Sequence, residues 1–284
     1  MNTLLSLGHG YSARALAQLL PPKDWRIHAT TRSPDKAAAL RGGTVVAHVF
    51  PGDDLTATLD AATHLLISAG PDAEGDPMLR HLRAAITARA GQFAWVGYLS
   101  TTGVYGNHDG GWVDEATPLT PSTRRGKWRV AAEAEWRAIA GLPLHVFRLA
   151  GIYGPGRGPF AKVRAGTARR IVKPGQVFSR IHVADIAQVL AASMARPDPG
   201  AVYNLCDDDP APPEDVIAHA ATLLDLPLPP EENFATAEMT PMARSFYAES
   251  KRVRNDRIKD DLGVRLIYPT YRDGLAALLE AGGD

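Results

Sequence analysis

A glycine turn near the start of the chain has the spacing of a phosphate-binding loop. Residues 8–13 read Gly-His-Gly-Tyr-Ser-Ala and lie between an apolar run and a helical pattern. The first glycine permits a tight turn, the second lets the backbone approach a pyrophosphate, and a small third residue lets helix and strand pack closely. The amides at the helix start would face the phosphate oxygens. The pattern predicts a dinucleotide site, with an ordinary strand-to-helix turn as the alternative. Its expected contacts are Gly8, Gly10, Tyr11, Ser12 and Ala13.

The end of the second apolar run indicates which dinucleotide is preferred. An NAD site usually has Asp or Glu there, which accepts a hydrogen bond from the ribose 2′-hydroxyl. Residues 29–33 instead read Ala-Thr-Thr-Arg-Ser. Arg32 offers a planar, charged fork that suits a 2′-phosphate, and Ser33 and Lys36 can assist it. We therefore expect NADP, with NAD possible as the cofactor; a solvated basic loop is the alternative.

Alternating strands and helices must position these residues. Apolar runs predict strands at residues 3–7, 25–31, 44–49, 64–68, 93–99, 144–149 and 201–205. Apolar residues at helical spacing predict helices at residues 11–20, 34–41, 55–61, 77–90, 129–140, 182–195, 213–224 and 271–279. Such alternation is typical of right-handed βαβ units in a parallel sheet. We therefore predict a doubly wound, Rossmann-type α/β fold, with Ser68 and Ala69 after the fourth strand as further cofactor contacts.

The second half of the sequence is less regular than the first, because glycine and proline interrupt it repeatedly. We expect a dinucleotide-binding domain over residues 1–155, to which residues 175–205 return. A smaller substrate lobe is expected over residues 156–174 and 206–284, where it would cap the carboxyl ends of the strands.

Five further motifs follow the glycine turn in order. They are Leu-Ser-Thr-Thr-Gly-Val-Tyr-Gly at 99–106, Trp-Val-Asp-Glu at 112–115, Phe-Arg-Leu-Ala-Gly-Ile-Tyr-Gly-Pro-Gly at 147–156, Ile-His-Val-Ala-Asp-Ile-Ala at 181–187 and Val-Tyr-Asn-Leu at 202–205. Together they resemble the extended short-chain dehydrogenase/reductase superfamily, specifically its NAD-dependent epimerase/dehydratase group. The resemblance implies the same fold and a nicotinamide dinucleotide cofactor.

The sequence departs from this family at the catalytic pair. The family places Tyr-x-x-x-Lys at the start of the helix after the fifth strand. Aligning on Gly126 and Glu133 puts Arg125 at the tyrosine position and Arg129 at the lysine position. In the family the tyrosine exchanges a proton with the substrate, while the lysine lowers the tyrosine pKa and holds the nicotinamide ribose. An arginine has a pKa above about 12 and no acceptor, so it is a poor proton shuttle.

The resemblance still suggests roles for residues at this position in the fold. Arg129 could donate to the ribose, and Arg125 could bind or polarise the substrate. Thr101 matches the family's Ser/Thr position and could orient a substrate oxygen. These three residues are the catalytic candidates. Leu7 also replaces the first glycine of the family's phosphate-binding motif.

A run of positive charge follows the sixth strand. Between residues 148 and 180 the sequence has eight Lys or Arg residues and no acid. They are Arg148, Arg157, Lys162, Arg164, Arg169, Arg170, Lys173 and Arg180. Such charge could steer an anionic substrate, such as a nucleotide-sugar diphosphate or a carboxylate. A solvated face balanced by the five acids of residues 206–215 is an equal alternative.

Composition limits the function classes. The 284 residues include 31 Lys+Arg and 31 Asp+Glu, so no net positive charge favours nucleic acid. The single cysteine excludes an intramolecular disulfide and a cysteine-based zinc cluster, and we expect no metal. Without a signal peptide or an apolar run of about 18 residues, we expect a cytoplasmic protein with no membrane partner.

We therefore predict an NADP-binding oxidoreductase or epimerase/dehydratase-like enzyme acting on a small molecule. A non-catalytic dinucleotide-binding sensor or scaffold is the alternative. A homodimer is possible through the helices predicted at residues 77–90 and 129–140.

Overall fold

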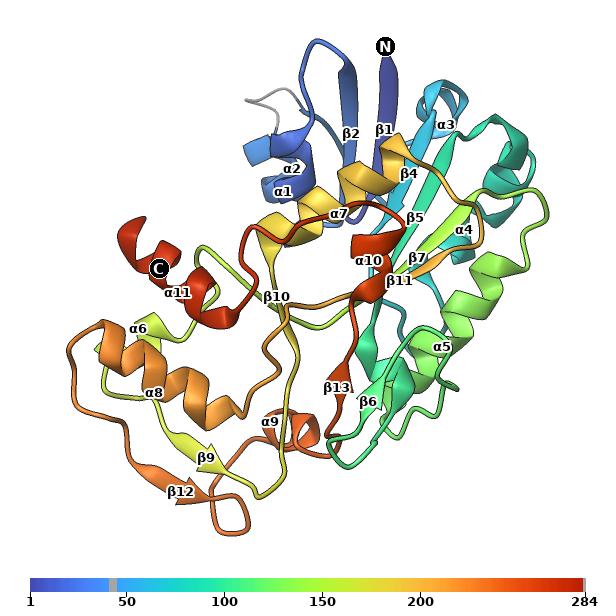
Figure 1. Cartoon of the computed structure of the whole chain (residues 1–284). Helices are drawn as coiled ribbons and strands as arrows, with labels where there is room; N and C mark the ends of the chain where they lie inside the picture. Colours follow the sequence, from blue (N-terminus) through green and yellow to red (C-terminus); the bar gives the residue numbers. More distant parts are fainter. Residues whose placement is uncertain (41–44, 283–284) are drawn as a thin grey trace.

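The centre of the molecule is a seven-stranded sheet in which every neighbouring pair of strands is parallel. The computed structural model describes residues 1–40 and 45–282. The strand order is β11-β7-β5-β4-β1-β2-β3 (Figure 1). The strands are β1 Asn2–Leu7, β2 Trp25–Thr31, β3 Val45–Val49, β4 His64–Ile67, β5 Trp95–Thr101, β7 Leu144–Leu149 and β11 Val202–Leu205. The predicted doubly wound fold is confirmed. Its strand order reverses between β1 and β4, where open α/β sheets bind ligands.

Helices cover both faces of this sheet because its strands are apolar on both sides. Leu4 of β1 packs with α1 Tyr11–Leu19 and α7 Val183–Ala195 on one face. Leu5, the next residue, packs on the other face with α3 Thr56–Ala61, α4 Pro77–Thr87 and α5 Arg124–Arg137. Alternate residues of a strand point to opposite faces, so a buried parallel strand is apolar throughout. The short helix α2 Pro34–Leu40 follows β2; position 41 of the predicted helix and position 44 of the predicted strand lie outside the described residues.

A second group of elements lies beyond the carboxyl ends of the strands (Figure 1). The helices α6 Phe160–Arg164, α8 Pro213–Leu223 and α11 Tyr271–Glu280 share a separate apolar core. Three short parallel strand pairs accompany them. They are β6 Trp112–Val113 with β13 Arg252–Val253, β8 Gly151–Tyr153 with β10 Arg180–His182, and β9 Arg170–Val172 with β12 Glu231–Asn233. The helix α9 Pro241–Phe246 also belongs to this group, whereas α10 Asp256–Asp260 packs with β11 in the apolar core of the sheet that contains α1 and α7.

The helix α5 begins five residues earlier than the sequence pattern predicts. The Thr123 hydroxyl accepts a hydrogen bond at 3.1 Å from the Gly126 amide, so it caps the helix and allows it to start at Arg124. Arg125 and Arg129 therefore occupy the first two turns of α5, four residues apart on one face. Two other predicted elements are also displaced: α4 ends at Thr87, and β5 runs from Trp95 to Thr101.

Candidate functional site

A cavity of about 1530 Å³ opens where the sheet meets the second group of elements. The glycine turn, the segment after β4, the end of β5 and the first turns of α5 line one side. Residues of β8, β10, α9 and α11 line the other side. The cavity therefore lies at the reversal of strand order, with walls from distant parts of the sequence.

The glycine turn is tight at its first glycine and open at its second. Gly8 has a φ of +85°, and a Cβ atom there would lie 2.8 Å from the Ala69 amide nitrogen. The Ser68 hydroxyl donates to the Gly8 carbonyl, which fastens the turn to the segment after β4. At Gly10 a Cβ atom would meet only the Gly8 carbonyl oxygen, at 3.9 Å. Gly10 lines the cavity, so the space above it is free for a ligand.

The helix that follows contributes two further cavity residues, Tyr11 and Ser12. The Tyr11 hydroxyl donates to the Pro155 carbonyl at 2.8 Å, and the Arg157 guanidinium lies over the Tyr11 ring at 5.8 Å. These contacts join the glycine turn to the loop after β8. Ala13 is 1% exposed and packs against the sheet, as its small size allows. 

Arg32 and Ser33 lie beside the reversal point but outside the cavity lining. Arg32 is exposed, and the Ser33 hydroxyl accepts a hydrogen bond at 3.3 Å from the Lys36 amide at the start of α2. The pKa of Asp72 is lowered first by a hydrogen bond from the Glu74 amide and in smaller part by the charge of Arg32. Arg32 therefore lies within electrostatic reach of the segment after β4.

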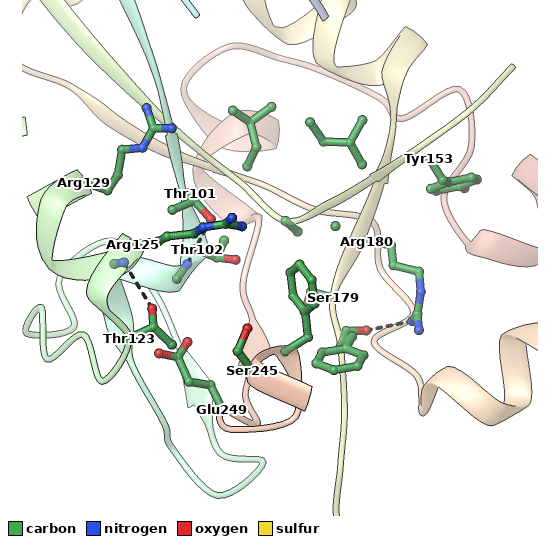
Figure 2. Close-up of a pocket in the computed structure, with 18 of the residues that line it drawn as sticks. Thr101, Thr102, Thr123, Arg125, Arg129, Tyr153, Ser179, Arg180, Ser245 and Glu249 are labelled. Atoms are coloured by element: carbon green, nitrogen blue, oxygen red, sulfur yellow. Dashed lines mark hydrogen bonds between the residues drawn. The ribbon is translucent and has the colours of Figure 1, made fainter. Parts of the chain in front are cut away.

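The structure brings Thr101 and Arg125 together. Thr101 ends β5, and its hydroxyl accepts a hydrogen bond at 3.2 Å from the Gly103 amide. Figure 2 shows the Arg125 side chain extending across Thr101 and Thr102 into the cavity. Within residues 1–40 and 45–282, the Arg125 guanidinium forms no hydrogen bond or ion pair. An exposed guanidinium with no partner can bind an anion.

Arg129 points away from Arg125 and is held by the sheet (Figure 2). Its Nη1 donates to the Tyr98 hydroxyl at 3.0 Å and to the Leu99 carbonyl at 2.8 Å. A Cβ atom on Gly70 would lie 3.3 Å from Nη2. The second nitrogen of Arg129 therefore approaches the segment after β4, on the cofactor side of the cavity.

A buried polar network fixes α5 against the sheet beneath these residues. The Glu133 carboxylate accepts hydrogen bonds from Ser100 and, at 2.9 Å, from Arg148. Burial acts to raise the pKa of Glu133, but its hydrogen bond and ion pair with Arg148 outweigh that effect and lower it. Arg148 also donates to the Tyr105 hydroxyl at 2.9 Å, and Tyr105 donates to Asn204 at 2.7 Å. Tyr105 and Arg148 therefore have structural roles.

The eight cations of residues 148–180 do not form one patch. Arg148 is buried and paired with Glu133, while Arg169 and Arg170 form ion pairs with Glu232 at 2.9 Å and Glu231 at 2.8 Å. Of the eight, the cavity lining includes Arg157 and Arg180. Three of the eight cations are therefore paired with acids and two border the cavity, so the run as a whole does not form one steering field.

One wall of the cavity, formed by α9 and the residues that follow it, was not predicted from the sequence. It includes Met242 and Phe246 of α9, together with Tyr247, Glu249 and Lys251. The Lys251 ammonium donates to Glu249 at 2.8 Å and to the Gly106 carbonyl at 2.7 Å. These residues lie in a proline-interrupted stretch without apolar periodicity, so no sequence signal marked them.

No protein-family model matches this chain. A conserved protein of unknown function from Silicibacter pomeroyi is 64% identical over 100% of both chains, with a TM-score of 0.95. A candidate NAD-dependent epimerase/dehydratase from Methylobacillus flagellatus is 25% identical over 100% of this chain and 99% of its own, with a TM-score of 0.74. The chain therefore shares its fold with NAD-dependent epimerase/dehydratases, which are members of the extended short-chain dehydrogenase/reductase superfamily. The resemblance seen in the sequence is thereby confirmed.

Two curated proteins are also similar to this chain. Protein YeeZ of Escherichia coli K12 is 26% identical over 282 residues, which cover 95% of this chain and 97% of YeeZ. A 3-diazoavenalumate denitrifying reductase from a Streptomyces species is 30% identical over 182 residues, which cover 57% of this chain and 58% of the reductase. In the described part of the chain, no helix is long and apolar enough to cross a membrane, and no cluster of side chains is suited to a metal ion.

Proposed function

We propose that this protein is an NADP-binding oxidoreductase or epimerase/dehydratase-like enzyme that acts on a small anionic substrate. In this proposal Arg125 and Arg129 take the places of the superfamily's tyrosine and lysine. The observation that carries the proposal is the Arg125 guanidinium, which has no hydrogen-bond or ion-pair partner in the described part of the chain and shares one cavity with Thr101 and the glycine turn. A substrate bound at Arg125 would lie beside a cofactor bound over the turn.

The geometry of the turn fits a dinucleotide. The open space above Gly10 would admit a pyrophosphate, while the tight packing of Gly8 on Ala69 keeps the turn in place. Tyr11 and Ser12 start α1 at the cavity edge, where the positive end of the helix favours phosphate. Ser68 and Arg129 border the nicotinamide half of such a ligand. The proposed cofactor contacts are Gly8, Gly10, Tyr11, Ser12, Ala13, Arg32, Ser33, Ser68 and Ala69.

The bound nicotinamide supplies a hydride donor or acceptor, and the protein's own residues would orient the substrate. Arg125 would bind the substrate anion, and the Thr101 hydroxyl would orient the reacting oxygen. Neither arginine can exchange a proton near neutral pH. Hydride transfer that needs no side-chain proton relay therefore suits this site better than tyrosine-dependent chemistry. The denitrifying reductase among the relatives supports a reductive reaction.

A preference for NADP is supported by Arg32 and by the missing acid after β2. The 2′-phosphate would form charge-assisted hydrogen bonds with a guanidinium that is exposed and close to the reversal point. A carboxylate at this position would instead repel it.

Fluorescence titration with NADPH and NADH tests the proposal. We expect NADPH to bind more tightly than NADH, and Gly10→Val to abolish binding of both. Gly10 has a φ of −90° and open space around its missing side chain, so valine should fill the phosphate site while the fold remains intact. A circular dichroism spectrum controls for folding. NADPH affinity unchanged by Gly10→Val, in a folded variant, would refute this cofactor site.

The alternative function, a dinucleotide-binding sensor without turnover, is favoured by the inability of Arg125 to exchange protons. A screen of carbonyl, carboxylate and nucleotide-sugar substrates with bound NADPH separates the two proposals. Oxidation of NADPH that depends on Arg125 supports the enzyme. Tight binding without turnover of any compound supports the sensor.

A further inference from the structure

The substrate end of the cavity combines positive charge with an apolar surface. Six cations line the whole cavity, against one acid, Glu249. They are Arg124, Arg125, Arg129, Arg157, Arg180 and Lys251. Glu249 is already paired with Lys251 at 2.8 Å, so it cannot neutralise the others. An anion is therefore the ligand charge that this cavity favours.

Three of the six cations, Arg129, Arg180 and Lys251, are hydrogen-bonded to the protein. Arg129 is bound to Tyr98 and Leu99, and Arg180 donates to the Phe178 carbonyl at 2.9 Å and to the Ala211 carbonyl at 3.0 Å. Arg125 has no such bond within the part of the chain that the structure describes. Figure 2 shows Arg125 directed into the space that Thr101, Ser179 and Ser245 border. Arg124 lies over the Trp128 ring at 5.7 Å and Arg157 over the Tyr11 ring at 5.8 Å, so Arg125 is the cavity cation with neither a hydrogen-bond, an ion-pair nor a ring partner among the described residues.

The opposite wall is apolar and unusually exposed. The helix α9 has no buried residue, and it presents Met242, 54% exposed, and Phe246, 61% exposed, at the cavity. Behind it, the Tyr247 ring packs edge-on against Phe178, with the ring centres 5.7 Å apart, and is tilted against Phe234, with the ring centres 5.1 Å apart. Large apolar side chains cost free energy when they face water, so an apolar ligand that covers them would gain affinity.

The two serine hydroxyls of this wall already have protein partners. The Ser245 hydroxyl donates to the Met242 carbonyl at 2.7 Å, and the Ser179 hydroxyl accepts from the Val253 amide at 3.1 Å. A sugar needs many precisely placed donors and acceptors, because an unpaired polar group in a closed site is costly. This wall offers a ring surface in place of such groups.

We infer that the substrate is a compact apolar carboxylate, such as an aryl-substituted short-chain acid, and not a nucleotide sugar. Its carboxylate pairs with Arg125, while its apolar body lies against Phe178 and Tyr247 and is covered by Met242 and Phe246 of α9. This inference rests on the proposed function, because it assumes that the cofactor binds over the glycine turn. It goes further by assigning the class of substrate and the residues that select it.

Titration of the NADPH-saturated protein with four acids tests this inference: benzoate, 3-phenylpropanoate, indole-3-acetate and octanoate. Calorimetry measures the affinities. We expect at least one acid to bind, and its neutral amide to bind about tenfold more weakly or worse, since the charge-assisted bond is lost. UDP-glucose should bind more weakly than that acid.

Two pairs of variants locate the contacts. Arg125→Gln should weaken the acid about tenfold, whereas Lys127→Gln should change the affinity less than twofold, because Lys127 is an exposed cation of the same helix that lies outside the cavity lining. Phe246→Ala should weaken the acid roughly fivefold or more through lost apolar contact. Leu228→Ala is its control, because Leu228 is 56% exposed outside the cavity lining.

The outcomes separate the inference from the proposed function. NADPH binding without binding of any of the four acids overturns the inference and leaves the cofactor proposal standing. Equal affinity for the acid and its amide, or tighter binding of UDP-glucose, also overturns it. Failure to bind either dinucleotide overturns the proposed function itself, whatever the acids do.

Discussion

Replacing Arg129 by alanine should lower both the stability of the fold and the affinity for cofactor, whereas Arg125→Ala should leave both nearly unchanged. The two arginines lie one helical turn apart on α5, but their contacts differ. Arg129 donates to the Tyr98 hydroxyl and the Leu99 carbonyl, and its guanidinium lies 5.5 Å from the centre of the Tyr98 ring. Arg125 has no hydrogen-bond or ion-pair partner among the described residues.

The size of the stability loss follows from the burial of Tyr98. This side chain is 0% exposed, so loss of Arg129 leaves its hydroxyl unpaired at a cost of about 1–3 kcal/mol. The cation–π contact adds about 0.5–1 kcal/mol. A total of about 2–4 kcal/mol corresponds to a fall in Tm of roughly 4–16 °C, at about 2–4 °C per kcal/mol for chains of similar size. Arg125→Ala should stay within about 0.5 kcal/mol, as for other exposed positions.

Differential scanning fluorimetry measures the stability change, and NADPH titration at a temperature where both variants are folded measures cofactor affinity. Arg129→Ala should weaken NADPH by about tenfold, because Nη2 borders the segment after β4 where the ribose is proposed to lie. Arg125→Ala should instead raise the substrate KM.

A second substitution tests whether the unpaired Tyr98 hydroxyl causes the loss of stability. Tyr98→Phe in the Arg129→Ala background removes the unpaired hydroxyl and should recover part of the lost stability, although it should not recover cofactor affinity. An unchanged Tm for Arg129→Ala, or an equal loss for Arg125→Ala, would show that the assigned contacts do not stabilise the fold.

Three further changes have defined outcomes. Arg32→Ala should narrow the ratio of NADPH to NADH affinity by about tenfold, measured by fluorescence, and an unchanged ratio would exclude Arg32 from the 2′-phosphate site. Burial raises the pKa of Asp207 to about 8, so the stability of the wild-type protein should fall as the pH rises from about 4 through 8. Asp207→Asn should lack this pH-dependent loss of stability, and parallel plots of Tm against pH for the two proteins would contradict the assignment. Arg148→Met should lower the free energy of unfolding in urea by up to about 3–5 kcal/mol, because it removes an ion-pair partner of the buried Glu133 carboxylate and leaves it only Arg137 and Ser100; adding Glu133→Gln should restore part of the loss.

The sheet and the glycine turn could be predicted because their signals are local. Apolar strands, glycines at fixed spacing and a following helix occupy consecutive residues, and the structure places β1, the turn and α1 there. The start of α5 could not be predicted from apolar periodicity, because residues 123–129 are mostly polar and include Gly126.

Gly126 is required by the tertiary packing of α5 against the turn after β5. A Cβ atom at position 126 would lie 2.8 Å from the Gly103 carbonyl oxygen, so only glycine lets α5 approach the turn after β5 this closely. The same close approach places Arg125 over Thr101 and Thr102. The sequence motif identified the two arginines. Only the fold shows that Arg129 is hydrogen-bonded to β5, whereas Arg125 has no hydrogen-bond or ion-pair partner among the described residues.

The cavity wall from α9 is the part that sequence reasoning could not supply. Met242 and Phe246 are ordinary apolar residues in a short, proline-initiated helix, and nothing in their spacing points to a ligand. Their role becomes apparent only from the structure, in which both side chains line the cavity. In the same cavity, α5 presents the Arg125 guanidinium, which has no hydrogen-bond or ion-pair partner among the described residues.

The division of labour between the two arginines supports the proposed chemistry. A tyrosine–lysine pair works by moving a proton, so its members must titrate; an arginine pair keeps its charge at every physiological pH. Fixed charge can hold an anion and position a ribose, but it cannot supply or remove the proton of a hydroxyl. If turnover occurs at this site, the pH dependence of its rate should therefore show no ionisation of Arg125 or Arg129. A pH dependence near neutrality would have to come from the substrate or from another group that lines the cavity.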